Sequence, residues 1–185
     1  MADNLTALVR MFDEYEQATQ EGRADSEKCR DYYDGRQLSE AEMRTLRRRK
    51  QPIVIENLIR PKIDYLCGLE RQTRTDPKAY PRTAGHEDDA NAATDALRYV
   101  TDDQLLDIKR SGVFQNMLIE GFGGVEVGHV KTRDGYDPKV TLIAWDRLFY
   151  DPHSCQPDFS DATFVGYVTW MDTETAKGRW PDRAD

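Results

Sequence analysis

The chain has 185 residues, of which 38% are hydrophobic and 32% are charged, and its formal net charge is −8. This length fits one domain, or one domain with a lobe, and the composition allows a lean hydrophobic core. A free-standing nucleic-acid-binding protein usually shows the opposite charge balance, and no stretch approaches the roughly 18 consecutive apolar residues of a membrane span. The spacing of Cys29, Cys67 and Cys155 argues against a disulfide framework and a zinc site, which favours a reducing interior.

Charge is arranged in blocks along the chain. Residues 47–82 hold 10 bases and 4 acids, whereas residues 83–108 hold 7 acids and 1 base. The simplest interpretation is that the basic and acidic blocks neutralise each other, within one chain or between chains.

The N-terminal residues predict helices. Apolar side chains recur at three- and four-residue steps from Leu5 to Tyr15, which places them on one helix face. We expect Gly22 to end this helix, a second helix to run over about 25–33, and Gly35 to stop it.

A third helix begins at a capping box. The Ser39 hydroxyl and the Glu42 carboxylate can satisfy each other's free backbone donors. Residues 53–55 are β-branched and are expected to be extended, and Asn57 is a candidate cap of the next helix. That helix carries an apolar stripe from Leu58 to Leu69, and residues 75–81 with their two prolines predict a loop or an extended segment.

The second half of the chain changes from helical to strand periodicity. A long helical region is expected over about 87–120, with a bend near residues 101–103 and a helix-ending turn at 121–124. Asp134-Gly135 is a hairpin signal, with a returning strand over 139–145. A third strand is expected over 163–171 and a further helix from Thr173.

This order predicts an α+β protein. Residues 1–120 form a mainly helical region with an extended segment at 72–82, and residues 121–171 form an antiparallel hairpin or small sheet. Residues 172–185 form the start of a further helix that the sequence cuts short.

No pattern indicates a catalytic centre, a cofactor or a metal. His86, His129 and His153 lack metal-ligand spacing, and the glycines at 121–124 follow a helix, whereas a phosphate-binding loop precedes one. Three aspartates share the loop 151–161 (Asp151, Asp158 and Asp161). They can hold a hard cation, but hydrogen bonds to nearby backbone amides are the preferred interpretation.

The most basic stretch of the chain consists of Arg47, Arg48, Arg49 and Lys50. These four side chains point in different directions around one helical turn, so they cannot all face one ligand. Three interpretations remain open, namely a solvated helix end that complements the helix dipole, salt bridges to acidic segments, and direct contact with DNA or RNA. Arg60 and Lys62 can join the same patch after folding.

The ordered set of motifs resembles the N-terminal part of the portal proteins of tailed bacteriophages, the large podovirus type in particular. Each motif alone is unspecific, but their order over about 25–171 is fairly specific. The motifs lie at residues 32–37, 52–59, 63–68, 72–81, 121–124, 149–152 and 160–162.

The resemblance implies a structural virion protein and no enzyme. Portal subunits form a ring, usually of twelve, at one capsid vertex, after assembly in the host cytoplasm. Double-stranded DNA is packaged and ejected through this ring without sequence-specific binding. The implied partners are other copies of the chain, the terminase large subunit, the head–tail adaptor and capsid or scaffolding proteins, with no membrane.

The chain departs from the resemblance in length, because portal proteins of this type are several times longer than 185 residues. We therefore expect a fragment that lacks the DNA-lining stem and the clip. The alternatives are a nucleic-acid-binding regulator that uses residues 47–82, a small enzyme with a metal in the loop 151–161, and a head–tail adaptor. Within the portal interpretation, we expect residues 47–50 to face an acidic segment such as Glu87, Asp88 and Asp89, in the same subunit or the next.

Overall fold

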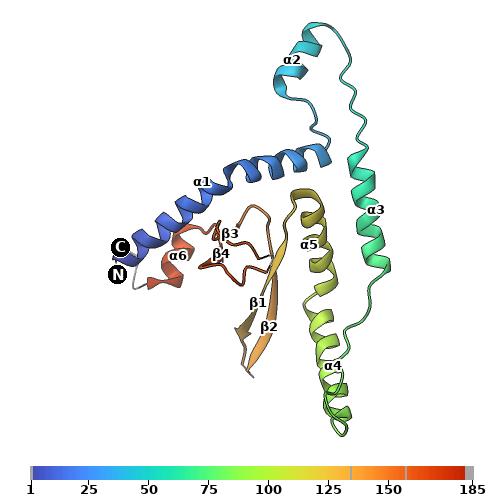
Figure 1. Ribbon diagram of the computed structural model, residues 1–185, viewed down its shortest axis with the longest axis vertical. Helices are drawn as coiled ribbons and strands as arrows, with labels where there is room; N and C mark the ends of the chain where they lie inside the picture. Colours follow the sequence, from blue (N-terminus) through green and yellow to red (C-terminus); the bar gives the residue numbers. More distant parts are fainter. Residues whose placement is uncertain (1, 134, 157, 182–185) are drawn as a thin grey trace. The chain divides into compact units, whose positions relative to one another are not determined.

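The computed structural model describes residues 2–133, 135–156 and 158–181, and side chains from residue 5 onward. Within these residues, helices precede two small sheets (Figure 1), so the predicted α+β class is confirmed. The helices are α1 (Ala2–Tyr33), α2 (Glu40–Arg48), α3 (Ile59–Gln72), α4 (Glu87–Asp103), α5 (Leu106–Glu120) and α6 (Thr173–Arg179). The strands are β1 (Gly124–Lys131), β2 (Tyr136–Ile143), β3 (Leu148–Tyr150) and β4 (Val165–Tyr167).

Helix α1 continues through Gly22, so the predicted break there is wrong. A glycine inside a helix costs only about 1 kcal/mol relative to alanine, and packing on either side outweighs this. Tyr15 is buried on one side of Gly22, and Tyr33 is buried on the other.

The predicted caps are confirmed. The Ser39 hydroxyl accepts from the Glu42 N–H at 3.3 Å, and the Glu42 carboxylate accepts from the Ser39 N–H at 2.8 Å. The Asn57 Oδ1 accepts from the backbone N–H groups of Ile59 and Arg60 at the start of α3. Asp172 caps α6 in the same way, so a helix does begin at residue 173.

The long helical region is interrupted between α4 and α5, slightly later than the predicted bend. Leu105 has a left-handed backbone with φ of +49°, which a helix interior does not allow. At the far end of α5, Gly121 has φ of +81° and ends the helix, as predicted.

Strands β1 and β2 form the predicted antiparallel hairpin, in which Val127 pairs with Val140. Gly135 has φ of +151°, and Asp134 lies outside the described residues. The β2 side of the sheet packs on α5, where a Cβ on Gly112 would lie 3.1 Å from a Leu142 methyl group.

The third predicted strand is shorter than expected and does not extend this hairpin. Residues 165–167 alone form β4, which pairs antiparallel with β3 in a separate two-stranded sheet. The described residues between 121 and 171 thus contain two antiparallel two-stranded sheets. A turn at residues 145–147 separates β2 from β3.

The chain divides into two compact units, residues 1–20 with 146–185 and residues 21–145, so α1 contributes to both. The first unit has a cluster of aromatic rings between α1 and the sheet of β3 and β4. The Tyr15 hydroxyl donates to the Leu148 carbonyl at 2.8 Å, and the Phe12 and Phe149 rings meet edge-on at 5.7 Å.

The second unit joins α1, α3 and α5 through partly buried polar contacts. Arg30 donates to the Oε1 atom of Glu120, whose side chain is fully buried, and the Tyr33 hydroxyl donates to Asp64 at 2.6 Å. Burial raises the pKa of Glu120, although its bond to Arg30 acts in the opposite direction. Among the described residues, the second carboxylate oxygen of Glu120 has no hydrogen-bond partner.

The core is small, and much apolar surface stays open. Among the described residues, no large hydrophobic residue is less than 2% exposed, whereas many large hydrophobic residues of α1, α3 and the segment before α3 are exposed. Leu5 is 65% exposed although it lies on the predicted apolar face of α1. No helix in the described part of the chain combines the length and the apolar character of a membrane span.

Candidate functional site

The predicted basic residues lie at the C-terminal end of α2, within the second unit. Arg47 and Arg48 occupy the last turn, Arg49 is the C-cap, and Lys50 has a left-handed backbone with φ of +55°. All four side chains are exposed, and in the part of the chain that the structure describes none of them forms an ion pair. The end of α2 thus presents unneutralised positive charge.

Arg60 and Lys62 lie one helix further on, in the first turns of α3. The Arg60 guanidinium is 3.7 Å from Asp64 and 5.4 Å from the centre of the Tyr33 ring, so it is engaged within the chain. Lys62 is exposed. Of these two residues, only Lys62 extends the free positive charge of α2.

The predicted acidic residues Glu87, Asp88 and Asp89 form the exposed first turn of α4. Asp89 lies 3.0 Å from His86, and no ion pair links this turn to α2 within the described residues. Figure 1 places α2 and the start of α4 at opposite ends of the second unit. The structure therefore does not bring the two predicted segments together in one chain.

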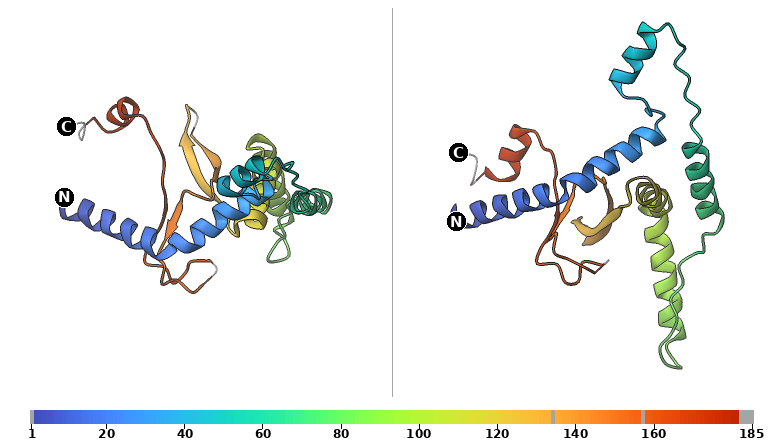
Figure 2. Two further views of the ribbon diagram at one scale, coloured as in Figure 1. Left: turned by 90° about the horizontal axis from the view of Figure 1, so that it is seen from above. Right: turned by 45° about the horizontal axis from the view of Figure 1, so that its top comes forward.

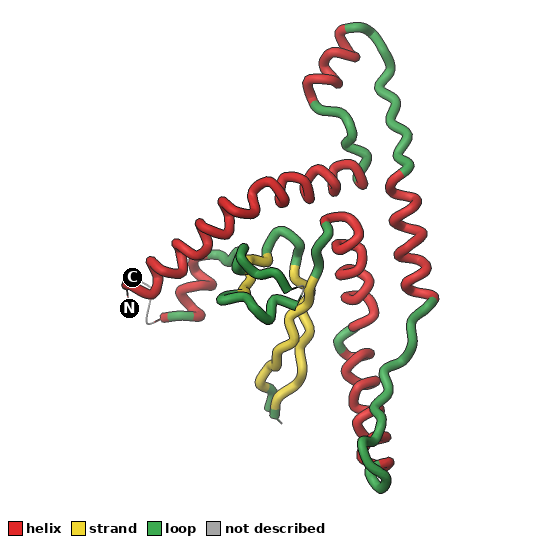
Figure 3. Tube along the Cα trace, in the orientation of Figure 1, coloured by secondary structure: helices red, strands yellow, loops and turns green. Residues whose placement is uncertain are grey.

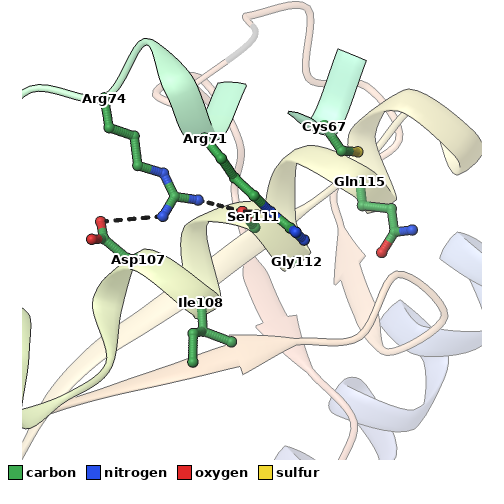
Figure 4. A pocket seen from close by; sticks show the side chains of 8 residues that line it. All are labelled: Cys67, Arg71, Arg74, Asp107, Ile108, Ser111, Gly112 and Gln115. Carbon is green, nitrogen blue, oxygen red and sulfur yellow. Dashed lines mark hydrogen bonds and ion pairs between the residues drawn. The ribbon is translucent and has the colours of Figure 1, made fainter. Parts of the chain in front are cut away.

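The structure has a pocket between α3 and α5 that the sequence did not reveal. Its volume is about 500 Å³, and it lies entirely within the second unit (Figure 4). The residues that line it are Cys67, Arg71, Arg74, Asp107, Ile108, Ser111, Gly112 and Gln115.

A polar network forms one wall of this pocket. Arg74 donates two hydrogen bonds to the Glu70 carboxylate, both of 2.8 Å, and the Ser111 hydroxyl donates to the same carboxylate at 2.9 Å. Arg74 also lies 3.6 Å from Asp107, and Arg71 donates to the Ser111 hydroxyl at 3.3 Å. Glu70 and Arg71 of α3, and Arg74 just after it, are thus linked to Ser111 and Asp107 of α5.

The electrostatics of the pocket favour a fixed ion-pair network. Hydrogen bonds from Arg74 lower the pKa of Glu70 to about 2, so this carboxylate is ionised at neutral pH. Burial raises the pKa of the Cys67 thiol, which keeps the thiol protonated and weakly nucleophilic. The arrangement positions α3 on α5 and supplies no activated nucleophile.

One sequence signal pointed to part of this network. Glu70 and Arg74 stand four residues apart, the spacing of a helical ion pair. Nothing local in the sequence showed that Ser111, 41 residues from Glu70, lies opposite them.

The aspartates of the loop 151–161 bind backbone amides, as predicted, within the first unit. Asp151 accepts from the N–H groups of His153 and Thr163, and Asp161 accepts from the N–H groups of Cys155 and Gln156. The bonds from these amides lower the pKa of Asp151. The hydrogen bond from the Ser154 hydroxyl, together with the amide bonds, lowers the pKa of Asp161. No cluster of three or more metal-ligating side chains is found among the described residues.

The comparison with protein families shows to which family the chain belongs. The family model of the phage P22-like portal proteins matches residues 9–185. The chain belongs to the phage P22-like portal protein family. The predicted resemblance is thereby confirmed, over a longer part of the chain than the motifs covered. A comparison with curated proteins gives no match.

Membership in the phage P22-like portal family gives the chain a structural role in the virion, at the portal vertex of the capsid. Portal proteins of this family are structural proteins that form oligomeric rings associated with the capsid and DNA. The exposed apolar and charged surfaces described above are therefore candidate contacts between subunits.

Proposed function

We propose that this chain serves as a subunit of the portal ring through which viral DNA is packaged into the capsid and later ejected. The observation that carries the proposal is the match to the phage P22-like portal family over residues 9–185. In this proposal the terminase large subunit, the head–tail adaptor and the capsid or scaffolding proteins dock on the ring.

The charge balance of the chain supports a conduit for DNA. Each phosphate contact from a lysine or arginine adds affinity through counterion release, so a ring with many such contacts would retain the strand. A net charge of −8 favours passage of DNA without tight or sequence-specific binding.

We further propose that the basic end of α2 in one subunit meets the acidic first turn of α4 in the next. The two segments lie at opposite ends of the second unit, and a closed ring repeats one head-to-tail contact in which unlike surfaces meet. The basic side consists of Arg47, Arg48, Arg49, Lys50 and Lys62, and the acidic side of Glu87, Asp88 and Asp89.

A charge reversal tests this contact. The double substitution Arg48→Glu and Arg49→Glu should weaken ring assembly of the chain expressed to the stop codon of its gene. Reversal of Glu87 and Asp88 to lysine in the same protein should restore it. Arg10→Glu, on an exposed part of α1 outside both segments, is the matched control. Unchanged assembly in the double variant would refute the contact.

The mass in solution tests the portal proposal itself. We expect the chain expressed to its natural stop codon to form a large ring by light scattering. A stable monomer that binds DNA with a steep salt dependence would instead identify a nucleic-acid-binding regulator that uses residues 47–82.

A further inference from the structure

Residues 51–58, which connect α2 to α3, form a drawn-out segment without helix or strand (Figure 3; Figure 2, right). The three residues at its centre are β-branched, and their exposure alternates along the chain. Ile53 is 36% exposed, Val54 79% and Ile55 37%. A period of two residues is the pattern of a strand that covers something with one face. The segment resembles a β-strand without a sheet.

Both ends of this segment are fixed. The Gln51 N–H donates to the Leu46 carbonyl at 3.0 Å, and the Asn57 side-chain amide donates to the carbonyls of Tyr32 and Tyr33 at 3.0 and 2.8 Å. Between them, no hydrogen bond with another described residue engages the main chain of residues 52–56. A segment held in this way loses little conformational entropy when it binds a partner.

The two outer edges of the β1–β2 hairpin differ: no hydrogen bond with another described residue engages the backbone of Val125, Val127 or His129 on the β1 side, whereas groups on the β2 side are occupied. The Val140 N–H donates to the Gln104 side chain at 3.2 Å, so it points away from β1. Pro138 lies two residues earlier on the same edge and has no N–H to offer. The outer edge of β2 is therefore closed.

The direction of the N–H groups along the outer edge of β1 follows from the same pairing geometry. Residues that face each other in an antiparallel pair both point their N–H groups inward or both outward. Val127 pairs with Val140, so its N–H also points away from the hairpin, as do those of Val125 and His129. Val127 is 74% exposed, whereas Val140 is 6% exposed. The apolar face of the sheet is thus covered at Val140 on β2 but exposed to solvent at Val127 on β1.

We propose that residues 52–56 of one copy of the chain add as a third strand to the free edge of β1 in a neighbouring copy. This inference rests on the proposed ring, because it assigns one contact between its subunits. A two-stranded hairpin is marginally stable by itself, and a third strand supplies both backbone partners and a neighbour for Val127. The strand donor and the strand acceptor lie on the same chain, so the contact is head-to-tail and can close a ring.

The charges at the ends of the added strand and of β1 indicate whether the two strands run parallel or antiparallel. β1 ends in Lys131, and Arg133 follows it. The added strand, residues 52–56, comes shortly after Lys50 and ends at Glu56. All four of these charged side chains are exposed. Antiparallel addition would bring the basic end of α2 beside Lys131 and Arg133. Parallel addition brings Glu56 there instead, so the added strand runs parallel to β1.

Paired cysteines test the contact in the protein expressed to its natural stop codon. Neighbouring strands lie about 4.8 Å apart, within the Cα separation that a disulfide bridges. Val54→Cys is combined in turn with Val125→Cys, Val127→Cys and His129→Cys, in a background in which the exposed Cys29 and Cys155 are replaced by serine. Thr141→Cys on β2 is the matched control, because one strand further away exceeds the reach of a disulfide.

We expect one of the three pairs to link neighbouring subunits of the ring at least about tenfold more than the Thr141 pair under mild oxidation. Moving the first cysteine from residue 54 to 56 should then move its partner two residues toward Lys131. A shift toward Gly124 would refute the parallel direction.

A ring in which none of the three pairs forms a disulfide would overturn the strand addition and leave the portal proposal intact. Absence of both the ring and the disulfide would overturn both. Val127→Pro provides an independent variant, because it removes an outward N–H without touching the bonds between β1 and β2. It should lower the linkage between residue 54 and its neighbours on β1, whereas Val127→Thr should preserve it.

Discussion

Replacing Glu70 by glutamine tests whether the polar network beside the pocket holds α3 on α5. The Glu70 side chain is 15% exposed and that of Arg74 is 18% exposed, so solvent screens this pair only partly. The difference between the usual carboxyl pKa of 4.5 and the folded value of about 2 corresponds to about 3 kcal/mol, at about 1.4 kcal/mol per pH unit. Because glutamine keeps one acceptor for Arg74 and Ser111, we expect a loss of about 2 kcal/mol at pH 7.

The direction of the Glu70 pKa shift determines how the loss of stability in Glu70→Gln depends on pH. The folded pKa of Glu70 is lower than the unfolded one, so its contribution is complete above about pH 4.5 and is lost as the pH falls toward 2. Urea unfolding of the wild type and Glu70→Gln should therefore differ at pH 7 and converge near pH 2. Glu14→Gln, in an exposed pair with Arg10, should cost less than about 0.5 kcal/mol at any pH. A Glu70→Gln difference that is small at pH 7, or equal at both pH values, would refute the reasoning.

Three further substitutions probe other parts of the fold. Arg30→Ala leaves the buried Glu120 carboxylate unpaired and should cost about 3–5 kcal/mol at pH 7 in urea unfolding, less at low pH where the raised pKa of Glu120 allows protonation. Gly123→Ala places a Cβ 2.5 Å from a backbone oxygen of α5 and should cost about 1–3 kcal/mol, whereas Gly124→Ala meets no atom within 4 Å and should cost less; equal melting temperatures would contradict this. Asp151→Ala should expose residues 151–163 to limited proteolysis, and Asp151→Asn should do so less, because it retains one acceptor.

Local features of the fold followed from the sequence because their causes lie within a few residues. The Ser39 capping box and the Asn57 cap depend on side chains that reach backbone groups two or three positions away. The helix-ending turn at Gly121 depends on a backbone conformation that glycine adopts without strain. The family, too, was apparent from the order of short motifs.

The continuity of α1 was not predictable from such local signals. The propensity of Gly22 argued for a break, but the buried Tyr15 and Tyr33 on either side hold the helix together. Packing of distant segments outweighs about 1 kcal/mol of intrinsic propensity.

By itself, the sequence determined the α+β class, most element positions, the hairpin and the portal family, since each has a periodic or local signature. Only the tertiary structure decided which segments meet. It placed β4 beside β3, and it brought Ser111 to Glu70 across 41 residues. Within the described residues, it also left the main chain of residues 52–56 without a hydrogen-bond partner. These outcomes depend on contacts between residues far apart in the chain, whose free energies no local pattern encodes.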